Sequence, residues 1–231
     1  MNAEYVGPPP DEIERLMTDL VAFINERDDL SPTVSAALAH AQFETIHPFH
    51  DGNGRVGRCL IHTILRREAT TDVSPPVSIA LARPGSHYVD GLTAFRRDDL
   101  DAWISLFSTA VRFASAATVG LGTRVAALRN RWQARLEENR SSQGVRRPRS
   151  DSALLRSLNC LPDMPAFRTR DLAERLRVTW RAAQDAVAEL EHAGVIKQVS
   201  AGKGNRLYEA MEVFEILDGF ENNPAGFVVD A

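Results

Sequence analysis

The chain has 231 residues, 44% of them hydrophobic and 25% charged, with a formal net charge of -4. This composition is typical of a globular protein, and the slight acidity argues against a broadly basic, nucleic-acid-binding surface. No basic-then-apolar leader is visible and no apolar run approaches the roughly 20 residues of a membrane span, so we expect a cytoplasmic protein without a membrane partner. Cys59 and Cys160 lie near apolar residues and are predicted to be reduced, buried thiols.

Helices alone are predicted for the first part of the chain. Apolar residues recur at three- and four-residue steps over residues 11–27, which is typical of an amphipathic helix. A second helix is predicted to begin at Ser31-Pro32, with serine as its N-cap and proline as its first residue. It should end just before Pro48, because proline disfavours helical geometry in the residue that precedes it.

A third helix is predicted from residue 53 or 54 to about 68. Two more follow over 86–96 and 100–138, and Gly120 and Gly122 are expected to break or kink the second of these. The buried stripe of the third helix is predicted to consist of Val56, Cys59, Leu60, Thr63 and Ile64.

The C-terminal part predicts a second, smaller domain. Residues 141–150 are polar without apolar periodicity, as in a linker. Three helices are then expected at 151–160, 169–177 and 179–193. Two strands follow at 195–199 and 206–209, and a last short helix at 211–217. Three helices followed by a hairpin is the order of a winged helix-turn-helix. The predicted fold is mainly α. It is divided into a helical domain (1–140), a linker (141–150), a winged helix-turn-helix (α+β) domain (151–220) and a tail (221–231).

The stretch HPFHDGNGRVGR, residues 47–58, lies between the second and third helices. Its helix, glycine loop, helix order differs from the strand-first order of the P-loop and Rossmann motifs. The start of the third helix presents unpaired N–H groups and a partial positive charge. Gly52, Asn53 and Gly54 would let these groups face an anion without obstruction by side chains, which predicts a phosphate-binding loop.

The charged side chains of this stretch fit the same chemistry. Arg55 and Arg58 lie near one side of the first helical turn, where each guanidinium can bind two phosphate oxygens. Asp51 beside a polyphosphate is best explained as a Mg²⁺ ligand, and His47 can accept a proton from an attacking hydroxyl. Each residue alone also has a structural interpretation, and a transition-metal site would lack a third strong ligand nearby. Their conjunction at one helix start predicts phosphoryl or nucleotidyl transfer.

Residues 47–58 resemble the signature of the Fic family, His-Pro-Phe-x-[Asp/Glu]-Gly-Asn-Gly-Arg-x-x-Arg, at every fixed position. The resemblance covers residues 5 to about 135 and implies a Fic-type helical bundle that transfers AMP from ATP to a hydroxyl of a target protein. It implies that His47 is the general base for a target Ser, Thr or Tyr, that Asp51 holds Mg²⁺, and that Phe49 is a buried anchor of the loop. The phosphate-binding residues that it implies are Gly52, Asn53, Gly54, Arg55 and Arg58.

Other aspects of this resemblance stay open. Tyr88, in the predicted helix that follows the motif, is a candidate for lining the pocket of the nucleotide base. UMP transfer, phosphate transfer or removal of AMP are alternative reactions at the same site. Self-modification and a homodimer are further hypotheses about the partners.

Two features that accompany many members of this family are not matched. Only residues 1–7 precede the proline-rich segment, so the β-hairpin flap that aligns a target is expected to be short, missing or removed. No segment matches the inhibitory pattern [Ser/Thr]-x-x-x-Glu-[Gly/Asn]. We therefore expect that this segment has been removed or that an antitoxin-like protein supplies it.

The predicted winged helix leaves two classes of partner open. Basic residues that could contact DNA phosphates lie around the start of its recognition helix, 179–193, and on its wing: Arg177, Arg181, Lys203 and Arg206. Asp185, Glu189 and Glu191 share that helix, so protein interaction is favoured over DNA binding. The alternative function for the whole chain is a nucleotide-sensing, DNA-binding transcriptional regulator.

Overall fold

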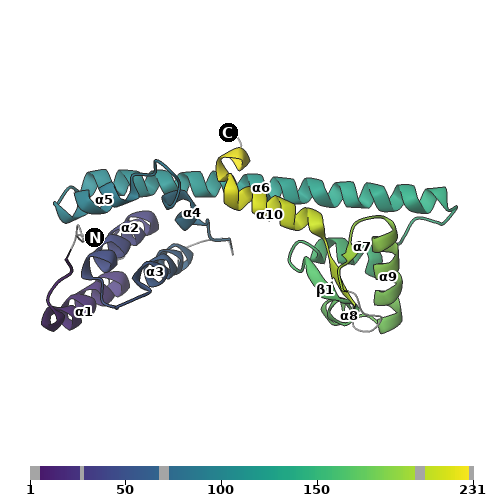
Figure 1. Ribbon diagram of the computed structural model, residues 1–231, viewed down its shortest axis with the longest axis horizontal. Helices are drawn as coiled ribbons and strands as arrows, with labels where there is room; N and C mark the ends of the chain where they lie inside the picture. Colours follow the sequence, from purple (N-terminus) through teal and green to yellow (C-terminus); the bar gives the residue numbers. More distant parts are fainter. Residues whose placement is uncertain (1–5, 27–28, 68–72, 201–205, 229–231) are drawn as a thin grey trace. The chain divides into compact units, whose positions relative to one another are not determined.

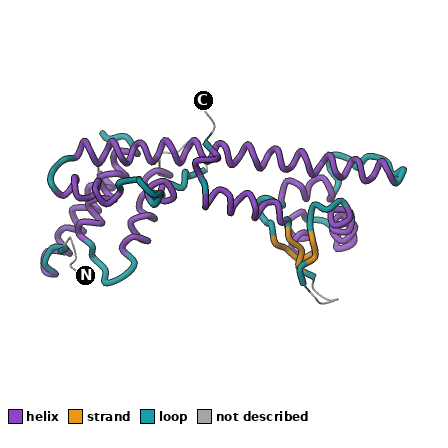
Figure 2. Tube along the Cα trace, turned by 45° about the horizontal axis from the view of Figure 1, so that its top comes forward, coloured by secondary structure: helices purple, strands orange, loops and turns teal. Residues whose placement is uncertain are grey.

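The computed structural model describes residues 6–26, 29–67, 73–200 and 206–228. This part of the chain is mostly helical, with one small sheet (Figures 1 and 2). It forms two compact units, one of residues up to 118 together with residue 228, and one of residues 119–227. The division between them falls within the residues of α6 (Leu100–Ser142), whereas the sequence predicts a division at 141–150.

The first unit contains the helices that the sequence predicts, and one short helix besides. They are α1 (Pro10–Glu26), α2 (Pro32–Ile46), α3 (Asn53–Arg67), α4 (Val77–Leu81), α5 (Tyr88–Arg96) and the first part of α6. The predicted start of α2 is confirmed, because the Ser31 hydroxyl accepts a hydrogen bond from the Val34 N–H at 3.4 Å. Its predicted end is also confirmed, since His47 follows Ile46 in the left-handed conformation with φ 50°.

Helix α2 lies at the centre of this unit and contacts α1, α3 and α5. Its alanines are fully buried, which allows neighbouring helices to approach closely. Trp103 and Phe107 of α6 complete the core, and the Trp103 indole N–H donates to the Ala37 carbonyl at 2.8 Å. This hydrogen bond satisfies a polar group that would otherwise be buried without a partner.

The predicted buried stripe of α3 is confirmed at Ile64 and wrong at most of its other positions. The buried residues of the core-facing side are Gly57, Ile61 and Ile64, whereas Val56 and Cys59 are exposed. Thr63 is also exposed and Leu60 is half-buried. The expectation of a buried thiol therefore fails for Cys59, and Cys160 is only partly buried. Apolar periodicity gave the wrong face because the contact with α2 is made where α3 has a glycine, not where it has its largest apolar side chains.

The predicted break at Gly120 and Gly122 is also wrong, because α6 continues through both residues. A Cβ atom at position 120 would lie 1.7 Å from the carbonyl oxygen of Phe227, in the 3₁₀ turn η1 (Pro224–Phe227). Gly120 therefore permits two backbones to touch within the second unit and does not interrupt the helix. Nothing in the structure explains the glycine at position 122.

By length and composition alone, α6 could cross a membrane, which the sequence analysis did not anticipate. Core helices of globular proteins meet the same criterion. Trp103, Phe107 and Ala114 of α6 are buried in the core of the first unit, which gives a packing reason for the apolar composition of its first turns.

The second unit holds the remaining helices and the sheet. Its elements are the rest of α6, α7 (Ala153–Cys160), β1 (Ala166–Arg168), α8 (Thr169–Leu176), α9 (Trp180–His192), β2 (Lys197–Gln198), β3 (Leu207–Glu209), α10 (Met211–Asn222) and η1. The sheet has the order β1-β3-β2 with antiparallel pairs, and Phe167 lies opposite Tyr208. Strand β1 is an addition to the predicted elements. It is too short for an alternating pattern to indicate it.

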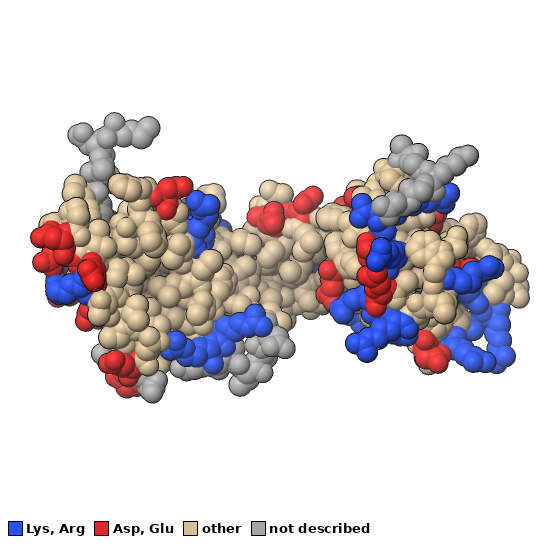
Figure 3. Space-filling view, turned by 90° about the horizontal axis from the view of Figure 1, so that it is seen from below, with Lys and Arg blue, Asp and Glu red and all other residues tan. Residues whose placement is uncertain are grey.

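Charge is unequal in the two parts of the sequence. Residues 119–227 contain 17 Lys and Arg against 14 Asp and Glu, whereas the rest of the chain contains 10 against 17. Figure 3 shows basic side chains gathered over the second unit, with acidic side chains between them.

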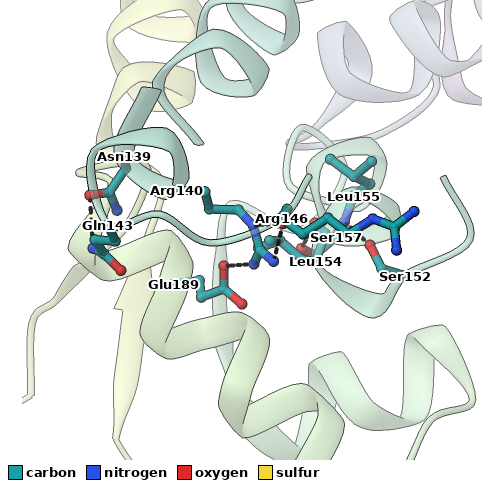
Figure 4. A network of polar contacts seen from close by, with 9 residues as sticks. All are labelled: Asn139, Arg140, Gln143, Arg146, Ser152, Leu154, Leu155, Ser157 and Glu189. Carbon is teal, nitrogen blue, oxygen red and sulfur yellow. Dashed lines mark hydrogen bonds and ion pairs between the residues drawn. The ribbon is translucent and has the colours of Figure 1, made fainter. Parts of the chain in front are cut away.

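The segment predicted as a linker is attached to the helices beside it (Figure 4). Helix α6 extends to Ser142, and the Arg140 guanidinium donates two hydrogen bonds to the Arg146 carbonyl, at 3.0 and 2.7 Å. The same guanidinium forms an ion pair with Glu189 of α9. Ser152 then caps α7 by accepting from the Leu155 N–H at 3.3 Å.

Candidate active site

The stretch 47–58 forms the exit of α2, a short loop and the first turn of α3. The predicted phosphate-chemistry residues all belong to this contiguous stretch. His47 is exposed, and its left-handed backbone turns the chain out of α2. Gly52 has φ 87°, a backbone conformation that residues other than glycine adopt only with strain. Glycine is therefore required at this corner before α3.

The Asn53 side chain fixes the loop. Its Oδ1 accepts from the Phe49 N–H at 3.0 Å, and its Nδ2 donates to the Phe49 carbonyl at 2.6 Å. Asn53 is 2% exposed, so this amide is part of the interior. We infer that the Asn53 side chain shapes the loop and that only its backbone N–H is free to face an anion.

The expectation that Phe49 is a buried anchor is wrong, because its side chain is 48% exposed. Its ring lies against Phe43, with the ring centroids 6.2 Å apart. The two hydrogen bonds between the Asn53 side chain and the Phe49 backbone hold the loop instead, so the aromatic ring need not be buried to fix it.

The first turn of α3 points unpaired N–H groups out of the helix. The amides of Arg55 and Val56 both donate to the Gly52 carbonyl at 3.0 Å. Within the described residues, those of Asn53 and Gly54 donate to no protein acceptor. These two N–H groups, at the positive end of the helix dipole, are the backbone part of an anion-binding site.

Two guanidiniums lie beside these amides. Arg58 folds back toward the start of the helix, since its Nη1 would be 3.4 Å from a Cβ atom at Gly54. Arg55 pairs with Asp51, with 3.1 Å between Nη2 and Oδ2, and these side chains are 72% and 91% exposed. An ion pair so exposed contributes little to stability, so each side chain can leave its partner and bind a ligand instead.

Asp51 is the residue of this site that could hold a metal ion. Within the described parts of the chain, no group of three or more His, Cys, Asp and Glu side chains could hold one by itself. A single exposed carboxylate fits Mg²⁺ bound together with phosphate oxygens and water, and does not fit a metal held by protein ligands alone.

A buried polar cluster, which the sequence analysis missed, lies behind the site. His40 and Glu44 stand one turn apart on α2 and are 1% and 8% exposed. A Cβ atom at Gly57 of α3 would lie 2.5 Å from Glu44 Oε1, so these side chains occupy the contact between the two helices. Within the described residues, His40 Nδ1 and Glu44 Oε1 have no hydrogen-bond partner.

Burial shifts the protonation equilibria of this cluster. It lowers the pKa of His40 to about 4, so the imidazole is neutral at physiological pH. It raises the pKa of Glu44, against smaller opposing effects of His47 and Arg58. Burial, with a contribution from Glu44, also raises the pKa of the Tyr88 phenol. The sequence signal for the cluster was a pair of polar residues four apart in an otherwise apolar, alanine-rich helix.

Tyr88 begins α5, and its hydroxyl lies 2.9 Å from His40 Nε2. The phenol is therefore engaged in the buried cluster. Its proposed place in a base pocket remains a prediction.

The four candidate nucleic-acid contacts belong to the second unit. Arg177 ends α8 in the left-handed conformation, and Arg206 precedes β3 with its side chain exposed. Arg181 forms an ion pair with Asp185 at 3.3 Å, which offsets its charge. Lys203 lies outside the described residues.

Residues 2–65 match the model of the Fic/DOC family. The chain is 35% identical over 72 residues to a probable protein adenylyltransferase of Aquifex aeolicus (strain VF5), covering 31% of this chain and 22% of that protein. It is 37% identical over 86 residues to the protein adenylyltransferase Fic of Drosophila grimshawi, and this match covers 36% of this chain and 17% of that protein. The chain therefore spans about a fifth of the length of the curated relatives that it matches.

Among solved structures, the chain is similar to the crystal structure of a Fic family protein from Desulfovibrio desulfuricans G20. The TM-score is 0.44 and the sequence identity is 21%. The match covers 91% of this chain and 59% of that chain.

Proposed function

We propose that this chain transfers AMP from ATP to a hydroxyl group of a protein, since residues 2–65 match the model of the Fic/DOC family. The observation that carries the proposal is the start of α3, where two free N–H groups and the guanidiniums of Arg55 and Arg58 lie in the same loop-to-helix stretch as the exposed His47. The adenylyltransferase names of the relatives in Aquifex aeolicus and Drosophila grimshawi support the same reaction.

In the proposed reaction, the oxygen of a Ser, Thr or Tyr hydroxyl attacks the α-phosphorus of ATP. The bond from that phosphorus to the oxygen of the β-phosphate breaks, and pyrophosphate leaves. The exposed His47 imidazole accepts the hydroxyl proton as the new bond forms. The Asn53 and Gly54 amides and the two guanidiniums stabilise the negative charge of the phosphates.

Mg²⁺ is part of this proposal. Asp51 would hold the ion together with phosphate oxygens, and the ion would neutralise the charge of the polyphosphate. Arg55, paired with Asp51 in this structure, would be released to bind a phosphate. ATP and Mg²⁺ are accordingly the expected substrate and metal.

The partners follow from the same proposal. The acceptor is a protein with an accessible hydroxyl side chain, with self-modification as the simplest case. A homodimer and an antitoxin-like inhibitor remain hypotheses about regulation. Transfer of UMP or phosphate, or removal of AMP, would use the same site.

We also propose that residues 151–220 form a winged helix-turn-helix domain. The element order α7, β1, α8, α9, β2, β3 and the antiparallel three-stranded sheet support this assignment. The side chain of Thr179 caps α9, the helix that would correspond to the recognition helix, by accepting from the Ala182 N–H at 3.2 Å.

Isotope position tests the proposed reaction. The chain is incubated with Mg²⁺ and ATP labelled either in the α- or in the γ-phosphate, alone and with a cell lysate. AMP transfer places only the α-label on protein, whereas phosphate transfer places only the γ-label. His47→Ala should abolish labelling, and the matched control His50→Ala, an exposed histidine of the same loop, should retain it. Label that persists in His47→Ala, or no label with the wild type, would contradict the proposal.

A further inference from the structure

A hollow of about 270 Å³ lies in the second unit, between the start of α8, one side of α9 and strand β3. Its walls include Arg168, Trp180, Gln184, Glu191, Arg206 and Tyr208. The α9 residues recur at positions 180, 184, 187, 188 and 191, which is the spacing of one helix face. The candidate active site is in the first unit, so this hollow is separate from it.

Two guanidiniums in this hollow are not neutralised by acids. Arg170, which also lines the hollow, pairs with Glu174 at 2.8 Å, and Arg181 on another side of α9 pairs with Asp185. By contrast, Arg168 and Arg206 have no ion-pair partner in the part of the chain that the structure describes. Unpaired guanidiniums that face one concavity are suited to hold phosphate oxygens through paired hydrogen bonds.

The aromatic wall of the hollow is exposed. Trp180 is 56% exposed, whereas Trp103 and Trp132 are fully buried, and the chain has three tryptophans. Indole is rarely left in water when packing can cover it, and its face binds the π-face of a nucleobase. The amide of Gln184 beside it can both donate and accept hydrogen bonds, as recognition of a base edge requires.

We propose that this hollow binds a nucleotide, with the base stacked on Trp180 and the phosphate held by Arg168 and Arg206. Gln184 lies in place to contact the base edge, and the Glu191 carboxylate can accept hydrogen bonds from ribose hydroxyls. The nucleotide is either free in solution or one unit of a single-stranded nucleic acid, since both present an accessible base next to a phosphate. A duplex does not, because its bases are already stacked on each other.

The exposure of a single tryptophan makes the hollow directly observable. Full-length chain carrying Arg58→Ala, which weakens the candidate active site, is titrated with AMP, ATP, a single-stranded oligoadenylate and a DNA duplex while tryptophan fluorescence is followed. Stacking on Trp180 should quench the fluorescence to saturation, and Trp180→Phe should abolish the quench. Arg168→Gln and Arg206→Gln should each weaken binding about tenfold or more. The matched control Arg175→Gln, at an exposed arginine of α8 outside the hollow, should leave the affinity unchanged.

The result also identifies the source of the nucleotide. Saturation by AMP or ATP assigns the hollow to a free nucleotide, and saturation by oligoadenylate alone assigns it to a nucleic-acid strand. A quench that persists in Trp180→Phe, no response to any probe, or a response only to the duplex would overturn the proposal. So would an equal response to inorganic phosphate at matched ionic strength. Because labelling by ATP is a separate measurement, failure here leaves the proposed transfer reaction intact.

Discussion

Polar groups occur in two contrasting settings within the first unit. At the start of α3, Asp51 and Arg55 are 91% and 72% exposed and pair only with each other. In the contact between α2 and α3, His40 and Glu44 are 1% and 8% exposed and are surrounded by apolar residues. Exposed charges can change partners at little cost, whereas buried polar groups can be held only by a well-packed structure. In the proposed function the exposed residues carry the chemistry, whereas the buried ones fix the position of α3.

The largest expected effect is on the pH dependence of stability. Because burial lowers the pKa of His40 from 6.5 to about 4, the unfolded chain binds a proton between these values that the folded chain does not. The neutral, buried His40 therefore contributes on the order of 3 kcal/mol to the free energy of unfolding. This contribution is fully present above pH 6.5 and is lost as the pH falls toward 4. Urea unfolding at a series of pH values measures this loss.

A pair of variants isolates the contribution of His40. His40→Gln should flatten the profile between pH 6.5 and 4, while His50→Gln, at an exposed position, should leave the slope unchanged. The raised pKa of Glu44 acts in the opposite sense, because the folded chain then holds a proton that the unfolded chain releases as the pH rises above 4.5. An equally steep profile in His40→Gln would show that the buried histidine does not control it.

The next effect is on the contact between the two helices. Gly57→Ala places a Cβ atom 2.5 Å from Glu44 Oε1 and 3.0 Å from the His40 ring, so the helices must move apart. We expect a loss of about 1–3 kcal/mol in the free energy of unfolding and reduced AMP transfer. Thermal unfolding compares it with Gly122→Ala, where a Cβ meets nothing within 4 Å and should stabilise α6 by about 0.5–1 kcal/mol. Equal stability of the two variants would refute a tight α2–α3 contact.

A smaller effect distinguishes the two residues that could hold the loop. Asn53→Ala removes both hydrogen bonds to the backbone of Phe49 and should lower the free energy of unfolding by about 1 kcal/mol, with reduced AMP transfer. Phe49→Ala should cost less, because its ring is already half exposed. Chemical denaturation of both variants provides the measurement. A larger loss for Phe49→Ala would restore the aromatic ring as the anchor.

The smallest effect on stability is expected at Asp51. Asp51→Asn breaks an exposed ion pair, so the free energy of unfolding should change by less than about 0.5 kcal/mol. AMP transfer should nevertheless be lost at a Mg²⁺ concentration that supports the wild type, because the carboxylate is the proposed ligand of the ion. A destabilised variant that remains active would reverse the roles assigned to the exposed and buried groups.

Local signals in the sequence predicted the framework of the fold. The Ser31-Pro32 start and the Pro48 end of α2 depend on neighbouring residues only, and both are confirmed. The candidate active site was predictable for the same reason, since its residues are contiguous. Tertiary contacts account for the failures. Gly120 lies within a continuous α6 and leaves room for the backbone of Phe227, and Gly57 faces α2 because a Cβ atom there would meet Glu44 and His40.

The central claim is that the start of α3 binds the phosphates of ATP. A crystal structure of the His47→Ala chain with ATP and Mg²⁺ tests it most directly, because that variant should bind the nucleotide without consuming it. We expect phosphate oxygens within hydrogen-bond distance of the Asn53 and Gly54 amides, with Arg55 released from Asp51 and Arg58 on the polyphosphate. Phosphates bound elsewhere, with the Arg55–Asp51 pair intact and the amides facing water, would contradict it.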